Sequence, residues 1–484
     1  MAVSIKKRPK SLLWVAIFVS ILFFSTFFMD FFTNIEKFIK NSWWRTEWRQ
    51  EITCYANIKH QIFNIKQFPY YSPVETYGTD TLFANPETSV LSPINLLLPF
   101  VSIYNFFIYH VCFHYIIALL GIILLRKYFK LPYLAILPMF FLLGFNGRIL
   151  SNYYMGHSMF ITYLYFPLLL YFYLNLMEQR KNVTLYAALT AFTMTMIFYE
   201  GGVHTINWII LFFFFDLLII VINILKRKGK YINHPRQVIT NLFPPIRNVI
   251  ITFIFFVLFS AIKLLPVMAS FGKWNPSRWR ITGYKNIIFF LQTFYQSELG
   301  SLIHWKELNI EEGYNFIGIE ASLLAILSIC YALFLAKVPT IKKLAIIGII
   351  LSILSFGDIF HDLFGSIPVL RGERVSSRFI FITIALLALL IPISINHVLL
   401  RLKASLKLRE ITMLLVGIGI FLRLYYESKK WMIASETQFD PYIPLSWRHG
   451  GGIEPHFFIG LAISSLSILG VVVFLLFQKR RSII

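Results

Sequence analysis

The acidic residues best suited to chemistry lie in a polar, aromatic stretch that follows the first hydrophobic segment. Glu51 stands beside Trp44 and Trp48, within residues 32–66, which contain no Gly or Pro and can form an amphipathic helix on a membrane surface. A carboxylate placed there can take a proton from an acceptor hydroxyl. Glu51 is therefore the candidate general base, and a solvated loop acid is its structural alternative. Three other acids are candidates for the same role: Glu47, Asp30 and Asp80.

Two histidines and a glutamate lie at further helix ends on the same side. His157 in NYYMGHS precedes a hydrophobic segment, and Glu200 and His204 in YEGGVH stand between two others. An imidazole suits phosphate or a sugar hydroxyl, and the structural alternative is a bond to a loop carbonyl. Gly201 and Gly202 allow either close approach to a ligand or a tight helical hairpin. We expect the two histidines and Glu200 to bind substrate.

Basic side chains gather near the same helix ends. Lys263 lies within the hydrophobic run FSAIKLLPV, where a lysine needs a partner, a task or access to the surface by snorkelling. Guanidinium groups suit bidentate recognition of phosphate, although Glu373 can pair with one of them instead. The predicted phosphate-binding residues are Lys263, Arg278, Arg280, Arg371, Arg374 and Arg378.

Long hydrophobic segments position these residues. Of the 484 residues, 57% are hydrophobic, which is more apolar surface than a soluble domain can bury. The segments are continuously apolar over helix length, which excludes a membrane barrel. We predict an all-α polytopic membrane protein with about twelve transmembrane helices in a single domain, 1–484. It comprises helix 1 (about 11–31), a large first outer loop (about 32–101) and a helical bundle (about 102–477).

The bundle is expected to contain eleven further helices. The short segments among them leave a total of eleven or thirteen spans open. The longest connections are a second long outer loop over about 271–313 and a loop of about thirty residues between 424 and 457. The predicted ranges are 102–125, 131–145, 159–177, 183–199, 205–225, 247–268, 315–336, 344–357, 379–400, 411–424 and 457–477.

The charge of the chain is sorted by side. Its net charge of +22 would by itself suit a nucleic-acid partner. However, the loops on one predicted side hold 24 Lys and Arg residues and two acids, Glu178 and Glu410, whereas the other side holds 20 of each kind. Positive-inside sorting explains this pattern. We therefore expect both termini in the cytoplasm and no nucleic-acid partner.

No recognisable metal or cofactor motif is present. The three cysteines, Cys54, Cys112 and Cys330, cannot form a disulfide framework or a metal cluster. There is no Walker loop and no Gly-rich strand-turn-helix. Since the polar complexity lies on the outer side, a transferase of this kind would take a lipid-linked donor at the outer leaflet. Membrane lipids are the expected partners, no metal ligand is assigned, and a divalent cation stays an open alternative.

Two acids within helices favour a different class of protein. Asp216 lies in the middle of FFFFDLLII, and Glu320 lies early in FIGIEASLL. Acids at membrane depth fit a proton or ion pathway. A transporter or flippase for a lipid-linked or anionic substrate is therefore the alternative function. It is not the preferred one, because the sequence lacks a series of such groups across the bilayer.

Five stretches along the chain together resemble the YfhO-like bacterial membrane proteins of the GT-C glycosyltransferase superfamily. An acid after helix 1 is followed by FPYYSPVETYGTDTLFANPETSVLSPINLLLP, which is similar to the family's Pro-aromatic segment, Gly turn and P-N-L run. GHSMFITYLYFPLLLYFY, YEGGVH, YNFIGIEASLLAI and LFGSIPVLRGERVSSRFIFI follow in the family's order. One departure is Glu51, where the family typically has Asp. Another is that the chain lacks the added outer domain of many members.

The resemblance implies a GT-C-like bundle in a bacterial plasma membrane. It implies transfer of a sugar from a polyprenyl-phosphate-linked donor to an envelope glycan, lipid or protein, with Glu51 at the position of the acidic base. The basic residues named above would stabilise the leaving phosphate. A non-catalytic envelope assembly factor is a third alternative, because a fold can persist without its activity.

Overall fold

The computed structural model describes most of the chain between Lys10 and Glu436. All regular elements in this part of the chain are helices, apart from one isolated bridge between Tyr284 and Phe356. The predicted all-α class is therefore confirmed for these residues. The helix predicted over 457–477 lies outside them. The described residues are 10–42, 47–69, 85–178, 182–227, 235–270, 282–296, 310–367, 370 and 373–436.

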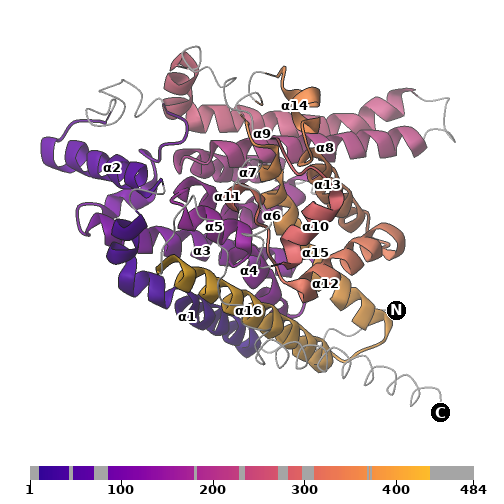
Figure 1. Cartoon of the computed structure of the whole chain (residues 1–484). Coiled ribbons are helices and arrows are strands. Elements are labelled where there is room, and N and C mark those ends of the chain that lie inside the picture. Colours follow the sequence, from indigo (N-terminus) through magenta and orange to yellow (C-terminus); the bar gives the residue numbers. More distant parts are fainter. Residues whose placement is uncertain are drawn as a thin grey trace.

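The helices follow one another in an order close to the predicted one (Figure 1). The α-helices are α1 (Ser11–Ser42), α2 (Trp48–Lys59), α3 (Ile103–Tyr128), α4 (Ile136–Gly144), α5 (Gly147–Tyr154), α6 (Phe166–Glu178), α7 (Val183–Tyr199), α8 (Val203–Arg227), α9 (Pro235–Ser270), α10 (Ile287–Tyr295), α11 (Ile310–Gly313), α12 (Ile319–Cys330), α13 (Pro339–Leu354), α14 (Ile359–Phe364), α15 (Ile380–Arg401) and α16 (Leu406–Glu436). Short 3-10 or π segments extend or link them: η1 (His60–Ile65), η2 (Pro93–Leu97), η3 (Tyr133–Ala135), η4 (Ser158–Tyr165), η9 (Tyr331–Leu335) and η11 (Ser376–Phe379).

Several of these helices are long and apolar enough to cross a membrane. The described residues contain six such helices, or seven if η3–α4 and α5, which meet at 46°, form one bent span. Two more apolar helices, α7 and α12 with η9, are shorter. These findings support an integral membrane protein, although the spans identified by length and composition number fewer than the predicted twelve. The six spans are Ser11–Glu36, Ile103–Tyr128, Ser158–Glu178, Val203–Lys226, Thr240–Ala269 and Ser376–Arg401.

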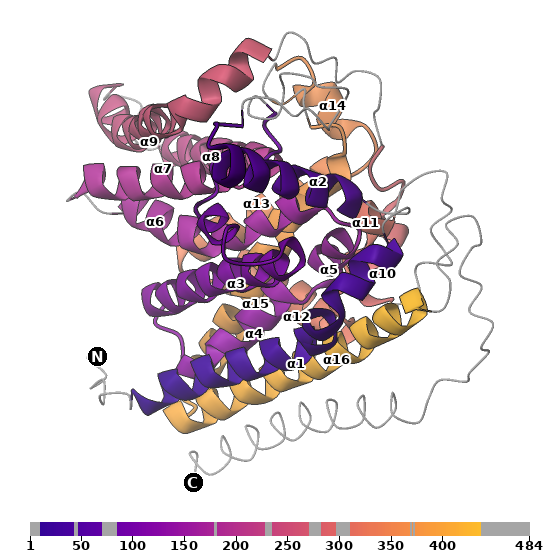
Figure 2. The same cartoon turned by 90° about the vertical axis from the view of Figure 1, so that its left-hand side faces the viewer.

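The helix α15 lies at the centre of the bundle. In its span, 94% of the apolar window is buried, against 28% for the span within α9. The α9 helix exposes Ile254, Leu258 and Leu265, as expected of a helix that faces lipid. It runs beside α8 in Figure 1, and α1 lies along α16 in Figures 1 and 2. The residues at the start of α15 therefore enter the interior of the protein.

Three stretches outside the predicted spans contain helix. The first follows helix 1, where α1 continues past a kink at Asn34 to Ser42, within the stretch 32–66 that we predict can form an amphipathic helix. The predicted loop over 271–313 includes α10, whose start is capped by Asn286, which accepts a hydrogen bond from the N–H of Phe289 at 2.7 Å. The third stretch, NGRILSNYYMGH, forms α5. A capping side chain, Asn286 for α10 and Asn146 for α5, marks where each of these two helices begins.

The break between α4 and α5 is made by the side chain of Asn146. Its Oδ1 accepts from the N–H of Ile149 at 3.1 Å and caps α5, and its Nδ2 donates to the carbonyls of Leu142 and Leu143 at the end of α4. Nδ2 also lies 2.9 Å from the hydroxyl of Tyr163. One residue thus satisfies backbone groups of both helices, which allows α5 to turn into the interior.

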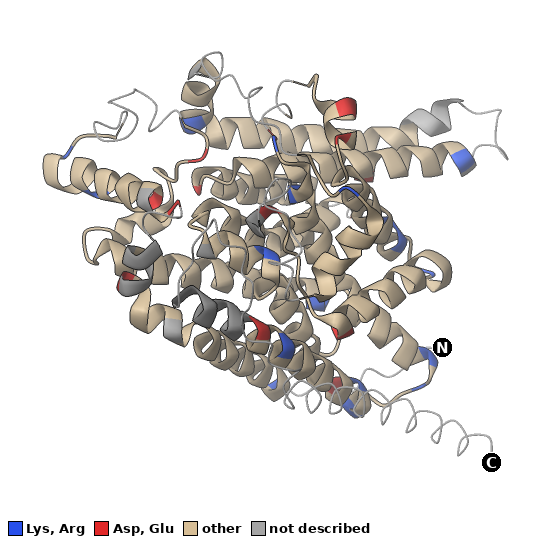
Figure 3. Cartoon of the chain, viewed as in Figure 1, with Lys and Arg blue, Asp and Glu red and all other residues tan. Residues whose placement is uncertain are grey.

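Charged residues are distributed unevenly over the molecule. Asp and Glu gather beside α2 on the left of Figure 3, whereas Lys and Arg predominate along the right-hand edge of the view. Four described acids, Glu47, Glu51, Glu87 and Glu200, lie where α2 and the end of the first loop meet the bundle, and others lie in α8, α14 and α16.

Candidate functional site

The first turn of α2 is docked onto the turn that follows α5. Trp48 is fully buried and packs edge-on against Tyr153, with 5.4 Å between the ring centroids. Gly156 has a φ of +88°, and a Cβ at this position would collide with the backbone of Trp48. The N–H of Glu47 donates to the carbonyl of Met155 at 2.9 Å. This docking places the acids of α2 next to the start of η4.

Those acids contact the two residues at the start of η4. The hydroxyl of Ser158 donates to Oε2 of Glu51 at 2.7 Å. Nδ1 of His157 lies 3.2 Å from Oε2 of Glu47, whose side chain is 50% exposed. Glu51 is the more buried of the two acids, and its carboxylate already accepts a hydrogen bond from an alcohol. A general base makes the same contact with a hydroxyl substrate.

Lys263 holds the end of the first loop against the helices. It is fully buried in α9, and its Nζ donates to the backbone carbonyls of Pro86 (3.2 Å), Thr88 (2.6 Å) and Phe198 (2.8 Å). An ammonium group has three N–H donors, and these three contacts account for all of them. Lys263 therefore does not snorkel, and its geometry gives it a positioning role in place of the predicted contact with phosphate.

The two glycines between α7 and α8 serve backbone packing. Gly201 has a φ of +80°, and a Cβ there would collide with the carbonyl of Glu87. A Cβ on Gly202 would meet Oγ1 of Thr162 and the side chain of Ile197. The groups that approach Gly201 and Gly202 closely therefore belong to the end of the first loop, to η4 and to α7.

A polar cavity of about 280 Å³ lies between α2, the loop over 85–89, the start of η4, the α7–α8 turn and the segment before α15. This volume is near the lower end of the range for small-molecule sites. Seven predicted site residues line it: Glu47, Glu51, His157, Glu200, His204, Arg374 and Arg378. The remaining lining residues are Gln50, Cys54, Tyr55, Asn85, Glu87, Thr88, Ser89, Ser158 and Met159.

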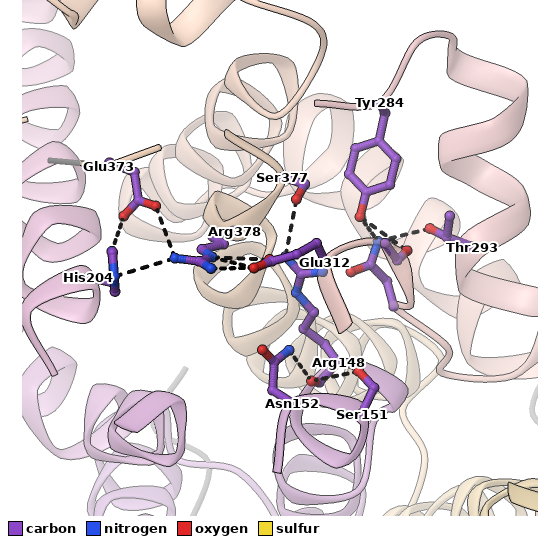
Figure 4. Close-up of polar contacts among 12 residues, drawn as sticks. Arg148, Ser151, Asn152, His204, Tyr284, Thr293, Glu312, Glu373, Ser377 and Arg378 are labelled. Carbon is purple, nitrogen blue, oxygen red and sulfur yellow. Dashed lines mark hydrogen bonds and ion pairs between the residues drawn. The ribbon is translucent and has the colours of Figure 1, made fainter. Parts of the chain in front are cut away.

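The inner wall of the cavity contains a buried ion pair (Figure 4). Nε of Arg378 donates to Oε1 and Oε2 of Glu312, at 2.8 and 3.1 Å, and its Nη2 also contacts Oε1. Nη2 of Arg148 lies 3.5 Å from Oε2 of Glu312 and 3.4 Å from the hydroxyl of Ser377. Glu312 belongs to α11 and Arg148 to α5, so this pair joins both short helices to the start of α15.

His204 extends the ion pair toward the cavity. Its Nδ1 lies 2.9 Å from Oε2 of Glu373, and its Nε2 lies 3.2 Å from Oε1 of Glu87. The indole N–H of Trp208 donates to the same Glu373 oxygen at 3.0 Å. The network has three carboxylates and two guanidinium groups, so a protonated His204 brings its total charge to zero. We call this the compensated network: Glu87, Arg148, His204, Glu312, Glu373 and Arg378.

The pKa values of two acids in this network are low. Burial by itself raises the pKa of Glu87, but the hydrogen bond and charge of His204, then the charges of Arg378 and Arg374, outweigh burial and lower it to about 2. At Glu312, burial also raises the pKa of the carboxyl group, but the charge and hydrogen bonds of Arg378 outweigh burial and lower this pKa to about 2. Such weak bases are poorly suited to take a proton near neutral pH.

Glu200 lies on the other side of the α7–α8 turn from the compensated network. Its Oε1 accepts from the hydroxyl of Ser92 at 2.6 Å, and its Oε2 faces His110 and His114 of α3. Burial raises the pKa of the Glu200 carboxyl. Glu200, which lines the cavity, therefore forms part of a second, separate cluster.

The other predicted site residues do not line the cavity or cannot be placed. Asp30 belongs to α1, and its side chain is outside the described part of the structure. The remaining four lie outside the described residues altogether: Asp80, Arg278, Arg280 and Arg371.

Sequence reasoning missed several residues of the site. Arg148 and Glu312 are 164 positions apart and meet only through the fold, and no local pattern distinguishes them from loop charges. Ser158 stands beside His157 in NYYMGHS, but no local pattern predicts its contact with Glu51, 107 positions away. His110 and His114 did leave a signal, a spacing of four within an apolar helix, which places both on one face.

A comparison of this chain with models of protein families, with curated proteins and with solved structures found no match. The resemblance to the YfhO-like proteins therefore rests on the sequence stretches alone.

Proposed function

We propose that the protein is a glycosyltransferase of the bacterial plasma membrane, with a GT-C-like bundle of about twelve spans and both termini in the cytoplasm. It transfers a sugar from a polyprenyl-phosphate-linked donor at the outer leaflet to an envelope glycan, lipid or protein. The Lys and Arg residues along the right-hand edge of Figure 3, on the opposite side from α2 and the cavity, support this orientation.

The contact between Glu51 and Ser158 carries the proposal. Glu51 accepts a hydrogen bond from an alcohol at 2.7 Å, in a cavity that other predicted substrate-binding residues also line. An acceptor hydroxyl that replaced Ser158 at this carboxylate would be placed to lose its proton as it attacks the sugar. Glu87 and Glu312 are poorly suited to this role because their pKa values are low, and Glu51 is preferred for its contact with the hydroxyl of Ser158.

Arg374 is the preferred group for the leaving phosphate. It lines the cavity and forms no ion pair with any residue that the structure describes. Arg378, in contrast, is held by Glu312 through several hydrogen bonds. A guanidinium group beside the base stabilises the negative charge that develops on phosphate as the glycosidic bond breaks.

One of the two acids that favour the transporter alternative, Asp216, has structural partners. Asp216 contacts Nζ of Lys343 at 2.7 Å and accepts from the hydroxyl of Tyr173 at 2.8 Å. A buried acid that is paired in this way needs no role in ion transport to explain it. A non-catalytic assembly factor is distinguished from a transferase at Glu51, because a protein without catalytic activity does not need the carboxylate of this residue.

The test uses cells that lack the protein and are rescued with the wild type, Glu51→Gln or Glu178→Gln. Glu178 is an exposed acid at the end of α6, away from the cavity, and serves as the matched control. Envelope glycans and lipid-linked sugars are then compared by mass spectrometry at equal protein levels. We expect Glu51→Gln to lower the transfer rate about 100-fold or more, because a general base contributes about that factor.

The outcomes separate the three functions. Loss of one sugar decoration, restored by the wild type and Glu178→Gln but not by Glu51→Gln, supports the transferase. Rescue by Glu51→Gln at the wild-type rate excludes Glu51 as the base. An unchanged envelope in cells without the protein, with no build-up of lipid-linked sugar, contradicts the proposed activity as a whole.

A further inference from the structure

The second cluster consists of Glu200, which lines the cavity, and of His110 and His114, which face Glu200 but do not line the cavity. The two histidines are four residues apart on α3, so their side chains lie on the same face of the helix. Glu200 reaches them from the α7–α8 turn, which is distant in sequence. All three residues are buried, with exposed fractions of 1%, 0% and 2%. Two imidazoles and a carboxylate thus converge in the interior.

The distances within this cluster suit a shared metal ion. Oε2 of Glu200 lies 3.7 Å from Nε2 of His110 and 3.9 Å from Nε2 of His114, and one ligand atom from each residue lies within 4.8 Å of the other two. These separations are too long for hydrogen bonds. Around a tetrahedral ion with bonds of about 2.1 Å, ligand atoms stand about 3.4 Å apart. Small side-chain movements would therefore complete the coordination.

The cluster leaves polar atoms without hydrogen bonds. Among the described residues, no partner is found for Oε2 of Glu200 or Nε2 of His114, both of which face the centre of the cluster, nor for Nδ1 of His110 on the far side of its ring from the nitrogen that faces Glu200. A buried polar atom without a hydrogen bond costs free energy, so several of them close together need an explanation. The hydroxyl of Tyr165 is also without a partner, and its ring packs edge-on against His114. Tyr165 thus adds a fourth buried polar group next to His114.

The orientation of the ligands is already set by their other contacts. Nδ1 of His114 lies 2.8 Å from the carbonyl of His110, and when Nδ1 donates this bond, Nε2 carries the free lone pair. Ser92 donates to the other oxygen of Glu200 and orients its carboxylate. Lys263 lies within electrostatic range of Glu200, but its N–H groups are bound to backbone carbonyls. It therefore offsets part of the charge without replacing a ligand.

We propose that His110, His114 and Glu200 bind one divalent transition-metal ion of the zinc type. Two imidazole nitrogens and one carboxylate oxygen are a ligand set of known zinc sites, whereas magnesium and calcium prefer oxygen ligands. The ion joins α3 to the α7–α8 turn and so supports the cavity wall that Glu200 helps to form. This inference does not depend on glycosyl transfer.

The test measures metal content and thermal stability of the full-length protein purified in detergent. Wild type, His114→Gln and Glu200→Gln are compared with His397→Gln, a half-buried histidine at the opposite end of α15 from Arg378. We expect about one equivalent of metal in the wild type and the control, and far less in the two cluster variants. A chelator is expected to lower the unfolding midpoint of the wild type by several degrees, and zinc chloride alone to restore it.

The proposal is wrong if zinc chloride, added to chelated wild-type protein, neither raises its unfolding midpoint nor binds in a stoichiometric amount. This result does not depend on whether any variant folds. It is also wrong if both cluster variants retain the wild-type metal content, because the ion then binds elsewhere. If magnesium stabilises the protein as strongly as zinc does, the assignment to a zinc-type ion is overturned.

Discussion

The clusters on the two sides of the α7–α8 turn use the same residue types but satisfy their charges differently. His204 has a carboxylate at each ring nitrogen, at 2.9 and 3.2 Å. Four residues earlier, Glu200 faces two imidazoles at 3.7 and 3.9 Å, and one of its oxygens lacks a hydrogen bond. Burial alone therefore does not distinguish a structural cluster from a binding site. The presence of partners does distinguish them, because a buried polar group without a partner can bind a ligand.

The largest effect is expected when the compensated network is broken at its centre. Arg378→Met removes the guanidinium group that binds Glu312 and leaves that carboxylate buried in the interior. Breaking a buried ion pair in this way costs about 3 to 5 kcal/mol. Thermal unfolding in detergent, followed by size-exclusion chromatography, should show a large drop in the midpoint or no folded protein.

The double variant Arg378→Met with Glu312→Gln tests the cause of that loss. The double variant removes one charge of each sign, so the net charge of the network is unchanged, but Arg148 also loses its contact with the Glu312 carboxylate. We therefore expect part of the stability to return. A double variant as unstable as the single one would show that Arg378 stabilises the protein through packing, for instance against the ring of Phe160, and not through charge.

The stability of the compensated network should also depend on pH. The pKa values of Glu87 and Glu312 are lowered to about 2 in the folded protein. The unfolded chain therefore binds more protons than the folded protein between about pH 4.5 and pH 2, so acid favours unfolding. The stabilisation that these two acids contribute is complete above about pH 5 and is lost as the pH falls toward 2.

Melting curves between pH 7 and pH 3 would measure this dependence. If the Arg378→Met, Glu312→Gln double variant folds, its curve should be shallower, because one of the two shifted acids is gone. An identical slope in both proteins would mean that acids outside the network dominate the acid sensitivity.

Much of the helical architecture could be predicted from the sequence, because apolar runs of helix length are a local signal. The prediction of a helix over 205–225 corresponds to α8, and that over 379–400 to α15. The prediction was wrong at α5, whose sequence is polar, because Asn146 caps it and the tertiary structure buries Arg148. Local sequence patterns do not contain the information for such a helix.

The candidate site was predictable only in part, for the same reason. Acids and histidines at helix ends pointed to Glu51 and His157, and the structure brings them to one cavity. Whether a charge has a partner is decided by contacts between distant segments. Arg378 therefore looked like Arg374 in the sequence, although Glu312 holds only the former.

The smallest effect on stability is expected in the cluster of His110, His114 and Glu200 when no metal is present. In Glu200→Gln, the amide oxygen can keep the bond from Ser92, and the amide nitrogen can donate to Nε2 of His114. The variant thus removes a buried charge and supplies a missing hydrogen bond. We expect its unfolding free energy to lie within about 1 kcal/mol of that of chelated wild type, or above it.

This result would sharpen the contrast with Arg378→Met, since one buried charge could then be removed at little cost and the other could not. Melting curves of both variants after the same chelator treatment give the comparison directly. Zinc should then separate wild type from Glu200→Gln, because only the wild type keeps the carboxylate ligand. If Glu200→Gln is instead as unstable as Arg378→Met without metal, Glu200 is a compensated structural acid, and the two sides of the α7–α8 turn do not differ as their geometry indicates.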